Sequence, residues 1–216
     1  MELVDLERLI KTRRSIRQWR KESVPEDMIV KAVEVATWAP NGGNQQNWRF
    51  LIVTGKTTID RIADAVQAKT VMMSDWPEAA EFGDEVKRWR AGAGFFRAAP
   101  VIVAVCMEVY ESVADKLLKL RLPKDHAAQP ILEHRRAANS GLQSVSAGVA
   151  YLLLALHAQG LGALWMTGPL VAKADIEEIL EVPEGLGLVA LIAVGYPAEQ
   201  PQRTRKPVAE VIAFRR

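Results

Sequence analysis

The chain has 216 residues, of which 49% are hydrophobic and 25% charged, as is ordinary for a globular protein with a substantial core. Its 28 basic and 26 acidic residues leave a net charge of +2, too small for a general attraction to nucleic acids or membranes. The single cysteine, Cys106, excludes an internal disulfide and fits a reducing compartment. The acidic N-terminal residues contain no apolar signal segment. We therefore expect one domain over residues 1–216, located in the cytoplasm, with no nucleic-acid or membrane partner.

Periodicity of the apolar residues predicts an order of helices and strands. Helices are expected at 3–12, from about Pro25 to near Trp38, at 58–69, at 131–159 and at 175–180, and strands at 48–54, at 99–107, after Gly160 and at 188–194. Ser23 and Glu26 have the spacing of a capping box for the second helix. Residues 125–130 are expected to form a loop. Residues 70–98 are left between two interpretations, a helical excursion that covers a pocket or a mobile lid.

The segment Arg13-Arg14-Ser15-Ile16-Arg17 places three arginines and a hydroxyl within five residues. A guanidinium offers a planar fork of donors that matches phosphate oxygens, and a serine hydroxyl completes such a site. An anion clamp for a phosphate monoester is one interpretation. The other is a solvated basic loop, which composition alone favours.

The loop that follows the second helix is unusually rich in amides. Its residues include Pro40, Asn41, Gly42, Asn44 and Gln46. Glycine lets the backbone approach a ligand closely, and amides offer donors and acceptors that would suit a heterocycle. A turn-rich surface loop is the alternative.

Other features indicate packing or assembly rather than chemistry. Small residues at 140–148 favour close packing of another helix, and a dimer interface would fit them. The last twenty residues have no core of their own and are expected to lie on another surface. Cys106 lies in an apolar run and is expected to be a buried, inert thiol. The three histidines lack metal-site spacing, so we expect no metal centre.

Four of these motifs, in this order, resemble the FMN-dependent nitroreductase family across nearly the whole chain. They are Arg13–Arg17, Ala39–Trp48, Gly160–Gly168, and Gly195-Tyr196-Pro197 with the basic residues Arg203, Arg205 and Lys206. The resemblance implies an α+β fold with a central mixed, mainly antiparallel sheet flanked by helices. It also implies a homodimer with FMN sites at the interface and a C-terminal tail exchanged between subunits.

The resemblance also implies a role for particular residues. Arg13, Ser15, Arg203 and Arg205 would bind the phosphate, with Arg14 beside it, and Arg17 would lie near the pyrimidine edge of the flavin. Pro40, Asn41, Gly42 and Asn44 would contact the flavin or ribityl chain, partly from the opposite subunit, with Gln46 close by. Trp165, Met166, Thr167 and Gly168 would line one face of the ring. Asn47 stands where the family usually has proline.

The implied activity is hydride transfer from NADH or NADPH through FMN to a nitroaromatic, a quinone or a similar small acceptor. One open flavin face would serve both substrates in turn, which predicts ping-pong kinetics. No side chain is assigned as an acid or base. Specialised members that dehalogenate aromatics, reduce enones or consume the flavin are alternatives. A further alternative is a nucleic-acid-binding module, in which Arg13–Lys21 bind the phosphates and a nucleobase stacks on Trp19.

Overall fold

A four-stranded antiparallel sheet lies at the centre of the computed structural model, which describes residues 2–215. Its strands are β1 (Trp48–Val53), β2 (Val101–Glu108), β3 (Gly162–Met166) and β4 (Leu186–Gly195), in the spatial order β1-β2-β4-β3. Ser15 adds a parallel bridge to Ala163 on the outer edge of β3. The expected α+β fold with a mainly antiparallel sheet is confirmed.

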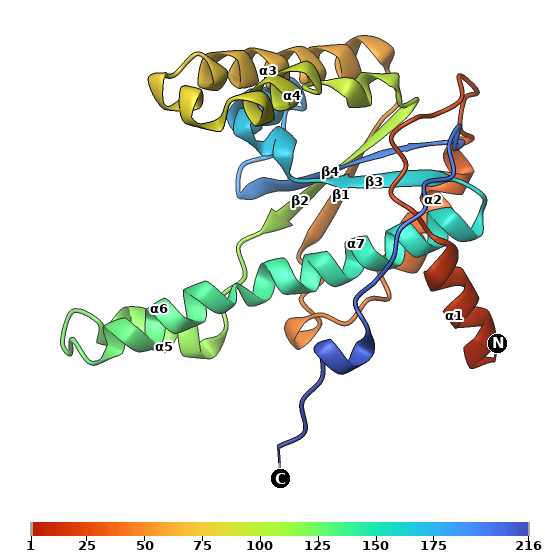
Figure 1. Ribbon diagram of the computed structural model, residues 1–216. Helices are drawn as coiled ribbons and strands as arrows, with labels where there is room; N and C mark the ends of the chain where they lie inside the picture. Colours follow the sequence, from red (N-terminus) through yellow and green to blue (C-terminus); the bar gives the residue numbers. More distant parts are fainter. Residues whose placement is uncertain (1, 216) are drawn as a thin grey trace.

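Helices cover both faces of the sheet (Figure 1). One face packs against α2 (Glu26–Ala36) and α7 (Ser140–Ala158), and the other against α3 (Lys56–Ser74) and α8 (Lys173–Ile179). The two-residue repeat of a strand divides β2 between these cores: Val103 and Val105 face α2 and α7, while Ala104 and Cys106 face α3 and α8. Because both faces are covered, β2 reads as a continuous apolar run.

The remaining helices extend from this core. They are α1 (Leu3–Thr12), α4 (Asp84–Ala91), α5 (Val113–Arg121), α6 (Ala128–Ala138) and short 3₁₀ turns at Gly42–Asn44, Pro77–Phe82, Phe95–Ala98, Gly168–Ala172 and Val208–Glu210. Residues 70–98 are therefore largely helical. We call α5 and α6 the arm, because Figure 1 shows them projecting beyond the sheet.

The helix predicted over 131–159 is interrupted at Asn139, which divides it into α6 and α7. Asn139 adopts a left-handed conformation (φ 42°), and its side-chain oxygen accepts a hydrogen bond from the Leu142 N–H at 3.2 Å. Asparagine tolerates this conformation better than most residues and caps a helix well. One residue thus ends α6 and starts α7.

Three local predictions also need correction. Ser23 does not cap α2; the N-cap is Pro25, and no side chain caps this end. Helix α3 begins at Lys56 and continues to Ser74, beyond the predicted 58–69. The expected loop at 125–130 ends early, since α6 begins at Ala128 and accommodates Pro130 in its first turn, where a missing N–H is tolerated.

The run from Ala128 to Ala158 is long and apolar enough to resemble a membrane span, yet half of its most apolar window is buried inside the protein. Leu152 and Leu156 are fully buried against the sheet. Burial of such a side chain stabilises the fold by about 1.5–3 kcal/mol. The apolar character of α7 is therefore explained by core packing.

The C-terminal tail leaves the sheet after β4 and extends away from the core (Figure 1). Its apolar side chains are largely exposed, among them Val208 (69%) and Phe214 (84%). The expectation that the tail lacks its own core is confirmed.

Candidate functional site

The two ends of the chain meet at a small cavity of about 110 Å³, which we call the basic cavity. It is lined by Arg13, Arg14, Ser15, Arg17, Pro201, Arg203 and Arg205. The arginines come from the loop after α1 and from the start of the tail. Within residues 2–215, none of the five forms a salt bridge with a carboxylate.

The electrostatics of the basic cavity are unfavourable for the protein alone. Burial and the nearby charges of Arg205 and Arg14 lower the pKa of Arg13. Burial and the charges of Arg13 and Arg14 also lower the pKa of His157, which lines a neighbouring cavity together with Arg14. The Nε of Arg14 is buried and has no hydrogen-bond partner among the described residues. Unpaired cations held together in this way form a site that an anion would stabilise.

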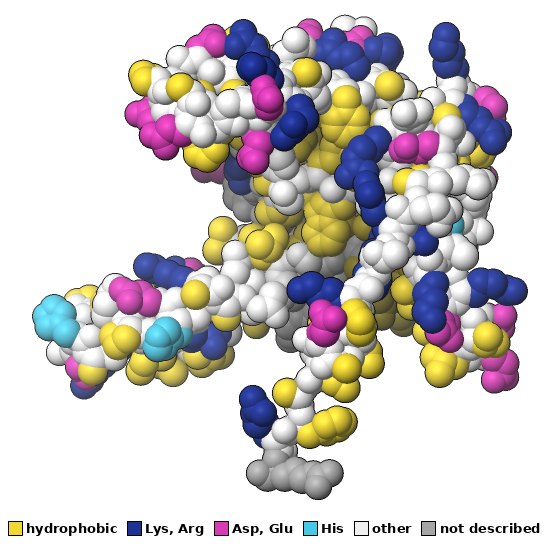
Figure 2. All heavy atoms as spheres, in the orientation of Figure 1, with side chains coloured by type: hydrophobic (Ala, Val, Ile, Leu, Met, Phe, Trp, Pro, Cys, Tyr) yellow, Lys and Arg dark blue, Asp and Glu magenta, His cyan; other side chains and the backbone are white. Residues whose placement is uncertain are grey.

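Arg17 also lines a second, larger cavity of about 370 Å³, which we call the aromatic cavity. Its walls are Arg17, Val66, Thr70, Trp89, Gly92, Ala93, Gly94, Phe95, Phe96, Leu164, Trp165, Met166, Thr167, Gly168 and Pro169. Trp89, Phe95 and Trp165 are each 37–40% exposed. Figure 2 shows hydrophobic side chains gathered in the hollow beneath α3 and α4, with basic side chains at its border.

Close packing against β3 fixes the segment that carries these arginines. The Ile16 N–H donates to the Ala163 carbonyl at 3.2 Å, and the Trp19 indole donates to the Gly162 carbonyl at 3.1 Å. A Cβ on Gly162 would lie 2.7 Å from Ile16 Cγ1, so only glycine permits this approach. Because Ile16 is buried, its neighbours Ser15 and Arg17 are held at the edge of the sheet.

The region from 70 to 98 contributes side chains that the sequence analysis did not assign to the site. Trp89 of α4 and Phe95 both line the aromatic cavity. Phe95 also stacks with Trp19, with ring centroids 6.4 Å apart. Two aromatic residues among charged neighbours were the available signal, but their direction depends on how α4 folds back onto α3. The interpretation of this region as a helical excursion covering a pocket is supported.

The amide loop lies elsewhere in the same chain. It precedes β1, whereas Trp165–Gly168 end β3, so the two segments lie at opposite edges of the sheet. Three strand spacings separate these edges, roughly 14 Å. Pro40, Gly42, Asn44 and Gln46 are exposed, and no described cavity joins this loop to the arginines.

Asparagine side chains give the amide loop and its junction with β1 their shape. Asn41 Oδ1 accepts from the Gln46 N–H at 2.9 Å, and its Nδ2 donates to the Ala39 carbonyl at 3.2 Å. Asn47 is buried and donates to the Glu108 carbonyl at 3.3 Å. Asn47 thus links the start of β1 to the end of β2.

Other candidate chemistry finds no support in this geometry. Burial raises the pKa of the Cys106 thiol to about 11, and Cys106 is fully buried within β2. Trp19 is 8% exposed, so it offers no free face on which a base could stack. Among residues 2–215, no group of three or more His, Cys, Asp or Glu side chains is arranged to hold a metal ion.

Two relatives illustrate the similarity to proteins of known sequence. An iodotyrosine deiodinase of Thermotoga neapolitana is 30% identical over 94% of this chain and 94% of its own. An NADH dehydrogenase of Thermus thermophilus is 29% identical over 94% of this chain and 92% of its own.

Solved structures share the fold over nearly their full length. A BluB-like flavoprotein of Clostridium difficile 630 superposes with a TM-score of 0.85 at 27% identity and covers 100% of both chains. An iodotyrosine deiodinase bound to FMN and 3-iodo-L-tyrosine superposes with a TM-score of 0.69 at 28% identity and covers 97% of both. The family model for the nitroreductase family matches residues 10–196. The chain therefore belongs to the nitroreductase family of flavoprotein oxidoreductases.

Proposed function

We propose that the protein binds FMN and transfers hydride from NADH or NADPH to a small neutral aromatic or quinone acceptor. The observation that carries this proposal is the basic cavity, where five arginines meet and no carboxylate of residues 2–215 lines the wall. A phosphate monoester would supply the missing negative charge, and Ser15 would supply a hydroxyl donor. The FMN-bound deiodinase structure gives the anion a precedent in a related chain.

The two cavities together match the two ends of FMN. Arg17 lines both, so a ligand with a phosphate at one end and a planar ring at the other would reach from the basic cavity into the aromatic one. Trp165–Gly168 would lie along the ring, since they form one wall of the aromatic cavity. Aromatic and apolar walls with few polar groups are typical of cofactor pockets.

FMN, when bound, supplies the reversible storage of two electrons that the reaction needs. The contribution of the chain is electrostatic and positional. The Arg17 guanidinium would stabilise negative charge on the reduced ring, because a fixed cation in a partly enclosed site costs no reorganisation during the reaction. The aromatic walls would exclude water and orient a planar substrate.

The lining of the aromatic cavity favours a neutral acceptor. Arg17 is its one charged side chain among the described residues, and no carboxylate faces the cavity. Reductive dehalogenation of an amino acid is the second candidate function, because relatives carry the name iodotyrosine deiodinase. The ammonium group of such a substrate would find no acidic partner in this chain's cavity, and an unpaired charge is costly to enclose.

A homodimer completes the proposed site. The exposed amide loop lies far from the arginines of its own chain, so Asn41, Gly42 and Asn44 would reach the flavin of a second copy. The exposed apolar residues of the tail, Val208, Val211, Ile212 and Phe214, would gain a covering surface in the same assembly.

The decisive experiment begins with the absorbance spectrum of the purified protein and identification of the flavin that heat releases. The loaded protein is then reduced anaerobically with NADH and NADPH and assayed with a nitroaromatic, a quinone and 3-iodotyrosine. We expect FMN, reduction by at least one nicotinamide, and parallel double-reciprocal lines with the neutral acceptors. A chain that binds no FMN would contradict the proposal, and preferential turnover of 3-iodotyrosine would favour the second candidate.

A further inference from the structure

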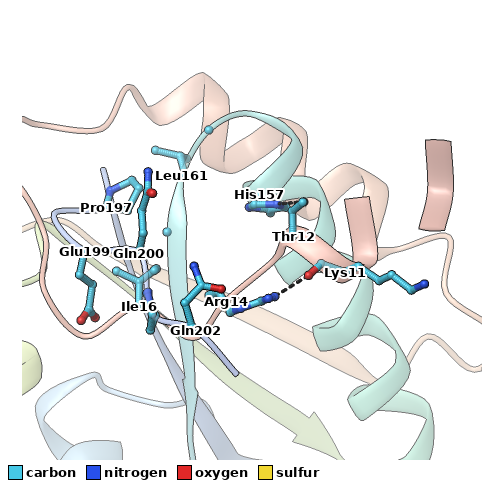
Figure 3. A pocket seen from close by; sticks show the side chains of 13 residues that line it. Lys11, Thr12, Arg14, Ile16, His157, Leu161, Pro197, Glu199, Gln200 and Gln202 are labelled. Atoms are coloured by element: carbon cyan, nitrogen blue, oxygen red, sulfur yellow. Dashed lines mark hydrogen bonds between the residues drawn. The ribbon is translucent and has the colours of Figure 1, made fainter. Parts of the chain in front are cut away.

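Glu199, at the start of the tail, holds the backbone of the arginine segment. Its Oε1 accepts hydrogen bonds from the Arg17 N–H at 2.5 Å and from the Gln18 N–H at 3.1 Å. The side chain is half-buried and forms no salt bridge with a described residue. Figure 3 shows it on the tail segment with Pro197, close to Ile16. One carboxylate oxygen therefore binds two successive amides 181 and 182 positions away.

These bonds lie at one end of a short two-stranded pairing between residues 18–20 and residues 196–198. The Arg20 N–H donates to the Tyr196 carbonyl at 2.9 Å, and the Ala198 N–H donates to the Gln18 carbonyl at 2.9 Å. Trp19 and Pro197 form an antiparallel bridge between these bonds. Beyond Ala198 the backbone pairing stops, and the Glu199 side chain takes over as acceptor. Because this one oxygen accepts from two successive amides, Glu199 fixes the end of this pairing.

The fixed end is the residue whose side chain enters the aromatic cavity. Arg17 is exposed and could adopt many conformations if its backbone moved. Glu199 itself does not line the aromatic cavity; it lines a separate cavity of about 420 Å³ that includes Ile16, Pro197 and Arg14 (Figure 3). An influence of Glu199 on a ring in the aromatic cavity would therefore pass through the position of Arg17.

We infer that Glu199 is a positioning residue, which anchors the Arg17 backbone through its side-chain acceptor oxygen and so sets where the Arg17 cation meets the bound flavin. This inference rests on the proposed function, because it presupposes that Arg17 stabilises the reduced flavin. On this inference, the first residues of the tail help to set the reduction potential of the bound flavin. This role is additional to the proposed binding of the phosphate by Arg203 and Arg205.

Two conservative variants separate reach from charge. Glu199→Gln keeps an acceptor oxygen at the same reach and removes the negative charge. Glu199→Asp keeps the charge and shortens the side chain by one methylene, so that it cannot hold both amides. If Glu199 acts by positioning, Glu199→Asp lowers the reduction potential of the bound flavin and slows its reduction severalfold, while Glu199→Gln stays close to wild type. A direct effect of charge predicts the reverse, because loss of an anion raises the potential and Glu199→Asp preserves it.

The measurements are the reduction potential of the bound flavin, by dye equilibration, and the FMN dissociation constant, by titration of the apoprotein. Glu184→Asp serves as the matched control, because Glu184 is an exposed acid before β4 with no side-chain hydrogen bond or salt bridge to a described residue. We expect the control to leave both quantities unchanged and Glu199→Asp to alter the potential more than the dissociation constant. An unchanged potential in Glu199→Asp, or a raised one in Glu199→Gln alone, would overturn the inference.

A double-mutant cycle separates this inference from the proposed function. In an Arg17→Ala background, Glu199→Asp should lower the potential no further, because the cation that it positions is absent. An equal lowering in both backgrounds would place the effect of Glu199 elsewhere and reject positioning. If Arg17→Ala itself leaves the potential unchanged, the role of Arg17 fails and positioning fails with it, while FMN binding by the wild type still stands as a separate result.

Discussion

Arg135 on the arm and Arg13 in the basic cavity are both half-buried arginines, but their surroundings are opposite. Arg135 donates to Asp115 Oδ1 at 2.6 Å and Oδ2 at 3.1 Å, and to the Ser112 hydroxyl at 2.9 Å. Arg13 faces Arg205 and Arg14 instead, and burial together with these charges lowers its pKa. The first group is satisfied within the fold, so its role is structural. The second has no anionic partner among residues 2–215, which is typical of a binding site.

The largest expected effect comes from removing one arginine of the basic cavity. Arg13→Ala or Arg205→Ala should weaken FMN binding by about 10- to 100-fold, since a charge-assisted hydrogen bond contributes roughly 1.5–3 kcal/mol. Titration of the apoprotein with FMN measures the effect. Arg8→Ala on α1, which removes an exposed arginine paired with Asp5, is the matched control.

The same substitutions should not destabilise the apoprotein, although they weaken FMN binding. Loss of Arg13 relieves repulsion among like charges, so the apo Arg13→Ala protein should melt at or above the temperature of the wild type. The gain in melting temperature on adding FMN should shrink, because ligand stabilisation follows affinity. A less stable apoprotein with unchanged FMN affinity would make the basic cavity structural, like the Arg135 cluster.

Truncation of the tail should separate its two parts. Deleting residues 207–216 keeps Arg203 and Arg205 but removes the exposed apolar group that includes Val208 and Phe214. Light scattering should then show loss or weakening of the dimer, with a smaller loss of FMN affinity than Arg205→Ala causes. A truncated protein that remains a stable dimer would show that the end of the tail is not needed for assembly.

Arg17→Ala should have a moderate and more specific effect. FMN should remain bound through the phosphate contacts, while the reduction potential falls and anaerobic reduction by NADH or NADPH slows, since the cation is needed most when the ring becomes negative. Arg17→Lys should restore part of the change, because it keeps the charge and loses the planar fork. An unaltered potential in Arg17→Ala would remove Arg17 from the electrostatics of the ring.

The smallest effect on function is expected at the arm. Hydrogen bonds from Arg135 and Ser112 hold the pKa of Asp115 well below its usual value of 3.8. A lowered folded-state pKa stabilises the protein at pH values above 3.8, and this contribution is lost as the pH falls below that value. Asp115→Asn should reduce the free energy of unfolding near neutral pH and flatten its decline in acid, as urea titrations would show. FMN affinity at neutral pH should stay unchanged.

The sequence by itself predicted most residues of the candidate site and the order of the main strands along the chain. The spacing Arg13–Arg17 was visible, as were the apolar runs of β2 and β4, because local pattern sets charge density and strand character. It also limited the chemistry, since one cysteine and scattered histidines left little room for a metal or thiol centre. Two helix ends were predicted incorrectly: the interruption at Asn139 and the start of α2 at Pro25. The conformation of a helix end depends on its neighbours in space.

Only the tertiary structure decided which charges lack partners. Arg13 and Arg135 are alike in sequence terms, and their difference depends on contacts made by residues up to 192 positions apart. Arg205 reaches Arg13 because the first residues of the tail pair with Gln18–Arg20, and Glu199 reaches the Arg17 amide for the same reason. Trp89 and Phe95 join the aromatic cavity because the helices after α3 fold back over the end of β3. These contacts between distant residues form because the chain buries a shared apolar core. Local sequence patterns do not show which distant segments that core brings together.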